Sequence, residues 1–118
     1  GPLTIVVPAA DWLPREIVRD TGAVGVRMPD HSISLDLIAR SGGALAVTSA
    51  NRSGEREAVT AAQAEIAIGE RVDLIIDGGG TPGGVPSTVV RVEEDGSLTI
   101  LRQGAIPADE LHAAVDQM

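Results

Sequence analysis

The chain has 118 residues and a net charge of −8, and its 43% hydrophobic and 22% charged residues are typical of a folded globular domain rather than a disordered segment. The absence of cysteine excludes disulfide scaffolds, thiol catalysis and cysteine–zinc clusters. No apolar run approaches the roughly 20 residues that cross a bilayer, and no secretory leader precedes the first apolar segment. We therefore expect a cytoplasmic protein with no membrane partner.

Short apolar runs alternate with segments of helical spacing, an order typical of an α/β fold, or α+β in some schemes. Strands are predicted at residues 3–7, 23–26, 44–47, 74–76, 87–92 and 98–101. Helices are predicted to begin near Pro14, Ile33, Thr60 and Pro107. A capping box of Thr60 and Gln63 supports the third helix. The last two strands form a predicted hairpin that turns at Asp95-Gly96.

The positive charges are nine arginines, with no lysine. A net-acidic domain binds nucleic acid weakly, because that affinity comes largely from neutralising phosphates. A single arginine can still hold a small anion through its planar, bidentate geometry. The charge pattern therefore favours a small-molecule site over a nucleic-acid groove.

Three polar or glycine-rich stretches follow predicted strands, at residues 27–31, 48–54 and 77–88. Ligands of open α/β sheets bind beyond the strand ends, so these stretches are candidates for a site. Each alone is more readily explained as a surface turn, and only the coincidence of three favours a site. The glycine run at 77–84 could offer backbone N–H groups to an anion or serve as a flexible connection. Ser87 and Thr88 could bind a carboxylate or phosphate, or cap the loop.

Six short strings follow one another along the chain: Gly1-Pro2-Leu3-Thr4, Val24-Gly25-Val26-Arg27-Met28-Pro29-Asp30-His31, Thr48-Ser49-Ala50-Asn51-Arg52-Ser53-Gly54, Asp77-Gly78-Gly79, Gly84-Val85-Pro86-Ser87-Thr88-Val89-Val90 and Leu101-Arg102-Gln103-Gly104-Ala105-Ile106. In this order they resemble the YrdC family of threonylcarbamoyl-adenylate synthases. The resemblance implies a twisted open mixed sheet with flanking helices and a concave ligand face.

The first half of the family pattern has no counterpart in this chain. Its Pro-Thr-Asp/Glu-Thr-x-Tyr-Gly-Leu stretch and its basic Lys-x-Arg segment would lie before residue 1. The resemblance therefore implies that residues 1–118 are the C-terminal portion of a single YrdC-like domain, with an incomplete sheet and ligand face. The first predicted strand, which has no partner segment before it, points the same way. We expect the chain by itself to be inactive.

The activity implied by the resemblance is that of a nucleotidyltransferase acting on L-threonine, bicarbonate and ATP. The threonine amine is carboxylated, and the carbamate attacks the α-phosphate of ATP, with Mg²⁺ on the phosphates. The products are threonylcarbamoyl-adenylate and pyrophosphate. A threonylcarbamoyl-transferase complex then modifies tRNA. The acidic charge of this chain argues against direct tRNA binding.

The resemblance also assigns roles to single residues. Arg27, Val47 and Ser87 match positions that bind L-threonine, and Arg27 would hold its carboxylate. The positions that match the nucleotide site are Ala23, Ser49, Asn51 and Arg102. No catalytic residue and no metal ligand is assigned. Two positions depart from the family pattern: Ala23 stands where many members carry threonine, and Gln103 stands where the family has proline.

Two alternative functions stay open at this point. A carbamoyl-adenylate-forming YrdC-like domain of hydrogenase maturation would use carbamoyl phosphate and would lie in a longer chain with zinc-binding cysteines. A non-catalytic RNA- or nucleotide-binding module is disfavoured by the negative charge for RNA. The residues encoded before Gly1 would distinguish these possibilities, because a Thr-x-Tyr-Gly motif there would indicate the synthase.

Overall fold

The computed structural model describes residues 1–82 and 84–118. The chain divides into two compact units. Residues 1–35 and 85–118 make up the first, which we call the sheet unit because it contains every strand of the described residues. Residues 36–84 make up the second, which we call the loop unit.

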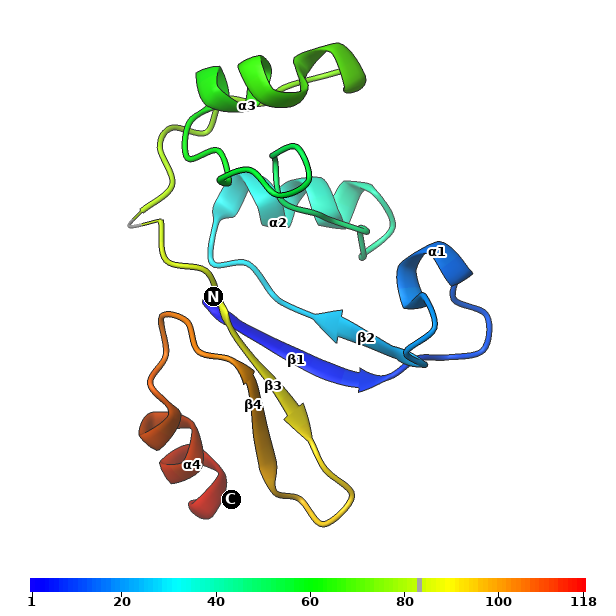
Figure 1. The fold of residues 1–118 in the computed structure, drawn as a ribbon, viewed down its shortest axis with the longest axis vertical. Coiled ribbons are helices and arrows are strands. Elements are labelled where there is room, and N and C mark those ends of the chain that lie inside the picture. Colours follow the sequence, from blue (N-terminus) through cyan, green and yellow to red (C-terminus); the bar gives the residue numbers. More distant parts are fainter. Residues whose placement is uncertain (83) are drawn as a thin grey trace. The chain divides into compact units, whose positions relative to one another are not determined.

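The sheet unit is built on a four-stranded mixed sheet (Figure 1). Its strands are β1 (Leu3–Pro8), β2 (Ala23–Val26), β3 (Thr88–Val92) and β4 (Leu98–Arg102). They lie in the order β2-β1-β3-β4. β1 pairs antiparallel with β2 and parallel with β3, and β3 pairs antiparallel with β4. The predicted mixed sheet is confirmed, as are the four predicted strands that form it.

The pairing of β3 with β4 is irregular at one point. Val89 pairs with Arg102, whereas the next residue, Val90, pairs with Ile100, so Leu101 is an extra residue on β4. Such a β-bulge reverses the alternation of side chains on the strand that carries it. Ile100 and Arg102 therefore lie on opposite faces of the sheet, although their spacing in the sequence would place them on the same face.

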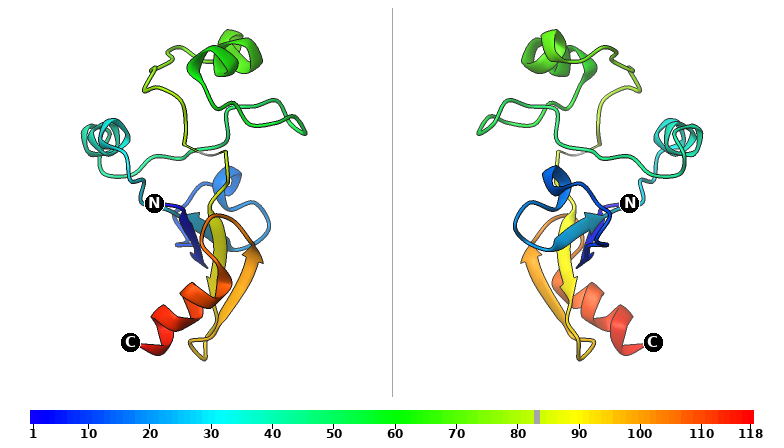
Figure 2. Two further views of the ribbon diagram at one scale, coloured as in Figure 1. Left: turned by 90° about the vertical axis from the view of Figure 1, so that its left-hand side faces the viewer. Right: turned by 90° about the vertical axis from the view of Figure 1, so that its right-hand side faces the viewer.

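The described residues also form four helices and one 3₁₀ turn. They are α1 (Arg15–Val18), α2 (Ser32–Arg40), α3 (Ala61–Ile68), the 3₁₀ turn η1 (Gly69–Arg71) and α4 (Ala108–Asp116). The predicted N-cap at Thr60 is confirmed, because the Thr60 hydroxyl accepts a hydrogen bond from the Gln63 N–H at 3.2 Å. The Gln63 side chain accepts from the Val59 N–H at 2.9 Å rather than from the Thr60 N–H of a full capping box. Figure 2 shows α4 beside the hairpin of β3 and β4. No helix among the described residues is long and apolar enough to span a membrane.

The buried residues of the described chain all belong to the sheet unit. They are Thr88, Val90 and Leu111, from β3 and α4. Large apolar side chains elsewhere stay exposed, among them Val47 at 89% and Leu74 at 76%.

The strands predicted at 44–47 and 74–76 are wrong, since neither segment forms regular secondary structure. A strand needs a neighbour for its backbone N–H and C=O groups, and within the described residues no strand pairs with these segments.

Candidate functional site

Two residues assigned to different substrates lie in direct contact in the sheet unit. Arg102, at the end of β4, donates hydrogen bonds from Nε and Nη2 to the Ser87 carbonyl oxygen at 3.2 and 2.9 Å. Its Nη2 also donates to Ser87 Oγ at 3.2 Å. The bulge at Leu101 makes this possible, because it brings Arg102 to the same face as Val89 and hence as Ser87. The structure thus brings Ser87, which is predicted to bind L-threonine, into contact with Arg102, which is predicted to bind the nucleotide.

The backbone at Ser87 is held from the opposite face of the sheet by hydrogen bonds of Thr88 to Gly104 and Ile106, which we call the brace. Thr88 is fully buried, and its hydroxyl donates to the Ile106 carbonyl and accepts from the N–H groups of Gly104 and Ile106. One donor and two acceptors exhaust what a hydroxyl offers, so Thr88 caps the loop after β4 and does not bind a ligand. Of the two roles expected for the Ser87-Thr88 pair, Thr88 therefore has the capping role.

Gly104 completes the brace. A Cβ atom at this position would overlap the Pro86 carbonyl oxygen and the Ser87 carbonyl group, so only glycine fits. The Ala105 N–H donates to the Pro86 oxygen at 3.1 Å. The segment after β4 therefore packs directly against the backbone that carries Ser87. The close packing of Gly104 was not predicted from the sequence, although a glycine shortly after Arg102 at the end of a strand could have indicated it.

Arg27 directly follows β2 and is exposed. It lies at the margin of an open depression of about 480 Å³, whose other lining residues are Gly1, Leu3, Ile5, Val7, Val26 and Met28. No carboxylate pairs with its guanidinium in the described part of the chain, which leaves the group available to an anion. Within the described residues, Arg27 forms no hydrogen bond with Ser87 or Arg102. Ala23 lies at the other end of β2, paired with Pro8.

In the loop unit, the segment that carries Val47, Ser49 and Asn51 is held by its own backbone. The Asn51 N–H donates to the Ser49 carbonyl at 3.1 Å, and the Ala58 N–H donates to the Ala50 carbonyl at 3.1 Å. Val47 is exposed. These backbone contacts hold Ser49 and Asn51 on one tight turn.

The Asn51 side chain forms hydrogen bonds through its amide nitrogen but not through its amide oxygen. Its Nδ2 donates to the carbonyls of Arg52 and Glu55 at 2.9 and 3.1 Å, which fixes the orientation of the amide. Its Oδ1 is buried and has no hydrogen-bond partner among the described residues. An orphaned buried acceptor is costly, and a donor from a ligand would satisfy it.

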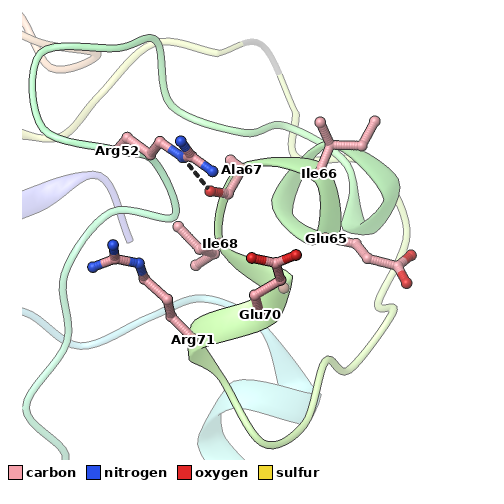
Figure 3. A pocket seen from close by; sticks show the side chains of 8 residues that line it. Arg52, Glu65, Ile66, Ala67, Ile68, Glu70 and Arg71 are labelled. Carbon is pink, nitrogen blue, oxygen red and sulfur yellow. Dashed lines mark hydrogen bonds between the residues drawn. The ribbon is translucent and has the colours of Figure 1, made fainter.

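Arg52 ties this turn to the end of α3 (Figure 3). Its Nε donates to the Ala67 carbonyl at 3.0 Å, one of the carbonyls that the last turn of a helix leaves without a partner. The contact lies at a small pocket of about 170 Å³, which Glu70 and Arg71 also line. This contact of Arg52 was not predicted, and the position of Arg52 within the string Thr48–Gly54 was the available signal.

The glycine-rich stretch at 77–84 lies in the loop unit, except that Gly83 falls outside the described residues. The Asp77 carboxylate accepts the Gly79 N–H at 3.0 Å. The Thr81 N–H donates to the Val59 carbonyl at 2.8 Å. Two of the N–H groups that an anion nest would need are therefore taken by the chain itself, and a carboxylate is present, so the described part of the stretch favours a turn.

The resemblance implies Mg²⁺ on the phosphates of ATP and assigns it no ligand in this chain. Within residues 1–82 and 84–118, no three histidine, aspartate or glutamate side chains gather around a common point.

Comparison with known proteins covers the whole chain. A family model of the Sua5, YciO and YrdC proteins, described as "Telomere recombination", matches residues 1–104. The chain is 37% identical over 118 residues to the threonylcarbamoyl-AMP synthase of Pyrococcus abyssi, covering 100% of this chain and 34% of that protein. It is 35% identical over 116 residues to the threonylcarbamoyl-AMP synthase of Bacillus subtilis, covering 98% of this chain and 33% of that protein.

A solved structure matches as well. The crystal structure of Pyrococcus abyssi Sua5 in complex with L-threonine superposes with a TM-score of 0.89 at 37% sequence identity, covering 100% of this chain and 34% of that one. The chain therefore spans about a third of the length of these relatives.

Proposed function

The chain belongs to the Sua5, YciO and YrdC family, and we propose that it forms part of a threonylcarbamoyl-AMP synthase. The proposed reaction converts L-threonine, bicarbonate and ATP into threonylcarbamoyl-AMP, pyrophosphate and water, the water being released when bicarbonate carboxylates the threonine amine. Residues 1–118 are proposed as the C-terminal portion of one domain of that enzyme. The observation that carries this proposal is the 37% identity, over the whole chain, to a protein whose crystal structure contains L-threonine.

The product would pass to a threonylcarbamoyl-transferase complex that modifies tRNA, in the cytoplasm. This proposal rests on the resemblance of the motifs and on the names of the relatives. The charge of −8 argues that tRNA itself is not bound by this chain.

For the amino-acid substrate, we propose contacts to Arg27, Val47 and Ser87. The free guanidinium of Arg27 would pair with the carboxylate. Ser87 would offer its hydroxyl, whose position is set by Arg102 and by the brace at Thr88. These groups bind and orient a zwitterion, and none of them needs to change its covalent state.

For the nucleotide, we propose contacts to Ala23, Ser49, Asn51 and Arg102. The buried and unpartnered Oδ1 of Asn51 supports this assignment, because adenine and ribose both carry hydrogen-bond donors. Ala23 would contribute only backbone and methyl contacts, in place of the hydroxyl that many relatives have.

The proposed chemistry depends on positioning and charge. Carboxylation of the threonine amine gives a carbamate, whose oxygen attacks the α-phosphorus of ATP as the bond to the pyrophosphate breaks. Holding the carbamate in line with that bond is the main contribution expected of the protein. Arginines beside the reacting groups would stabilise negative charge as it moves to the leaving pyrophosphate.

The proposal is tested on the full gene product that contains this chain. Pyrophosphate release is expected only when L-threonine, bicarbonate and ATP are all present. Release that depends on carbamoyl phosphate instead would indicate the hydrogenase-maturation type of reaction. No release with either set of substrates would refute an adenylate-forming function.

Arg27→Ala sharpens this test. Loss of a charge-assisted pair to a carboxylate costs about 2–5 kcal/mol, so the affinity for L-threonine should fall roughly 30-fold or more. Arg27→Lys should stay impaired, because lysine lacks the planar fork. Calorimetric titration with L-threonine measures both variants, and normal binding by Arg27→Lys would contradict the bidentate role.

A further inference from the structure

A row of four residues crosses one face of the sheet, with one residue from each strand or its edge. Gly25 comes from β2, Thr4 from β1, Ser87 from the residue before β3 and Arg102 from β4. The register places them together, since Val6 pairs with Gly25 and Thr4 pairs with Val89. The end of the row at Ser87 and Arg102 belongs to the site proposed above. Thr4 has no assigned role there.

Thr4 is joined to Ser87 by a hydrogen bond between their side chains. The Thr4 Oγ1 and Ser87 Oγ atoms lie 2.8 Å apart in a partly buried position, between residues 83 positions apart in the sequence. The Thr4 hydroxyl forms no other hydrogen bond within the described residues. The bond is therefore a tertiary contact between β1 and the start of β3, directly beside the Arg102 guanidinium.

The rotamer of Thr4 is set by Gly25. A Cβ atom at Gly25 would lie 3.1 Å from the Thr4 Cγ2 methyl, which is tighter than ordinary packing. The absence of a side chain at Gly25 therefore makes room for that methyl on the β2 side of the strand. Because a β-branched side chain is stiff at χ1, seating the methyl there directs the hydroxyl toward Ser87.

The hydrogen-bonding capacity of Ser87 shows why this matters. A serine hydroxyl has one hydrogen to donate and two lone pairs that accept. Arg102 Nη2 occupies one lone pair. If Thr4 donates to the other, the Ser87 hydrogen stays free for a ligand acceptor. If Ser87 donates to Thr4 instead, no hydrogen remains, and Ser87 can only accept.

We propose that Thr4 is a positioning residue: its hydroxyl donates to the second lone pair of Ser87, so that, with Arg102 on the first, the Ser87 O–H points toward an oxygen of the substrate amino acid. The proposal rests on the proposed function, which supplies that substrate. A carboxylate only accepts hydrogen bonds, so binding one selects the arrangement in which Thr4 donates. Gly25 serves the same purpose by seating the Thr4 methyl.

The test compares Thr4→Val with Thr4→Ser in the full gene product. Valine keeps the shape of threonine and removes the hydroxyl, whereas serine keeps the hydroxyl. We expect Thr4→Val to weaken L-threonine binding roughly tenfold, about the effect of one net hydrogen bond, measured by calorimetry without ATP. Thr4→Ser should bind much more like the wild type, and the KM for ATP should change little in both variants.

Thr99→Val is the matched control. Thr99 also lies on a strand, and its hydroxyl donates to Glu93 rather than to any residue of the row. It should bind L-threonine like the wild type. Gly25→Ala gives a second, independent perturbation, because its methyl would press on that of Thr4, and it too should weaken threonine binding selectively.

The outcomes separate the two proposals. Wild-type protein that binds no L-threonine refutes the proposed function, and this inference with it. Wild-type protein that binds L-threonine together with an unaffected Thr4→Val variant refutes the role of Thr4 alone. Equal losses of L-threonine affinity in Thr4→Val and Thr4→Ser would also overturn the role of Thr4. So would a KM for ATP that rises in Thr4→Val as much as its L-threonine affinity falls, since either result would indicate general damage to the fold.

Discussion

The sheet unit and the loop unit hold their candidate residues by different means. In the sheet unit, Ser87 and Arg102 are fixed by strand pairing and by a fully buried threonine. In the loop unit, no described residue is buried. Asn51 is fixed by hydrogen bonds within its own turn, and the next residue, Arg52, bonds to the Ala67 carbonyl in the last turn of α3. Tertiary packing positions the first pair, and local polar contacts position the second.

The difference predicts different responses to mutation. A residue fixed by packing against backbone fails when volume is added, because the neighbouring backbone cannot move away without disturbing the ladder. A residue fixed by an exposed hydrogen bond loses only that bond. Substitutions in the sheet unit should therefore cost more than comparable ones in the loop unit.

The largest effect is expected from Gly104→Ala. The added methyl would overlap the carbonyl groups of Pro86 and Ser87, so the segment after β4 would have to separate from the start of β3. We expect a loss of about 3 kcal/mol or more in the free energy of unfolding. Denaturant titration of the full gene product measures it, together with amide exchange in β3.

Gly80→Ala, in the loop unit, is the control for that experiment. The nearest atom to a Cβ there is the Val59 carbonyl oxygen at 3.9 Å, an ordinary contact. A change of less than about 0.5 kcal/mol is expected, as for most substitutions away from a packed contact. If both glycine variants were equally stable, the brace at Gly104 would not be the rigid element described here.

A smaller effect is expected from Arg52→Ala. The variant leaves the Ala67 carbonyl without its donor and frees the turn that carries Asn51. For an exposed hydrogen bond, we expect a local loss of about 1 kcal/mol, seen as about fivefold faster amide exchange in the last turn of α3. Arg71 lines the same pocket but forms no side-chain hydrogen bond within the described residues, so Arg71→Ala should exchange like the wild type. Equal acceleration in the two variants would show that charge alone matters.

The smallest effect concerns pH and the hairpin. Hydrogen bonds from Arg91 and Thr99 lower the pKa of Glu93 below its ordinary value of 4.5. The folded state thus favours the charged carboxylate, and its contribution is present above pH 4.5 and is lost as the pH falls through the lowered pKa.

Glu93→Gln should therefore flatten the acid dependence of amide exchange in β3 and β4 below pH 4.5. The change should be slight, because the groups are exposed to solvent. Glu94→Gln provides a neighbouring control that should keep the wild-type acid response. An unchanged acid response in Glu93→Gln would mean that these hydrogen bonds do not persist in solution.

The sequence by itself determined the local elements. Alternating apolar runs predicted the four strands of the sheet, Asp95-Gly96 predicted the hairpin turn, and the Thr60–Gln63 pair predicted the start of α3. These predictions succeeded because each depends on residues close together in the chain, where periodicity and capping act directly. The ordered motifs likewise indicated the family, since they are short strings that need no tertiary information.

Only the tertiary structure decided how these elements meet. The runs at 44–47 and 74–76 have the composition of strands but lack a partner among the described residues, and strand formation depends on pairing as well as on propensity. The bulge at Leu101 turned Arg102 to the face of Ser87, a change of side that depends on the register of two strands. The same register placed Thr4 against Ser87 across 83 residues of sequence. Side-chain alternation along a strand can be read from the sequence, but the pairing of distant strands is set by their contacts in space.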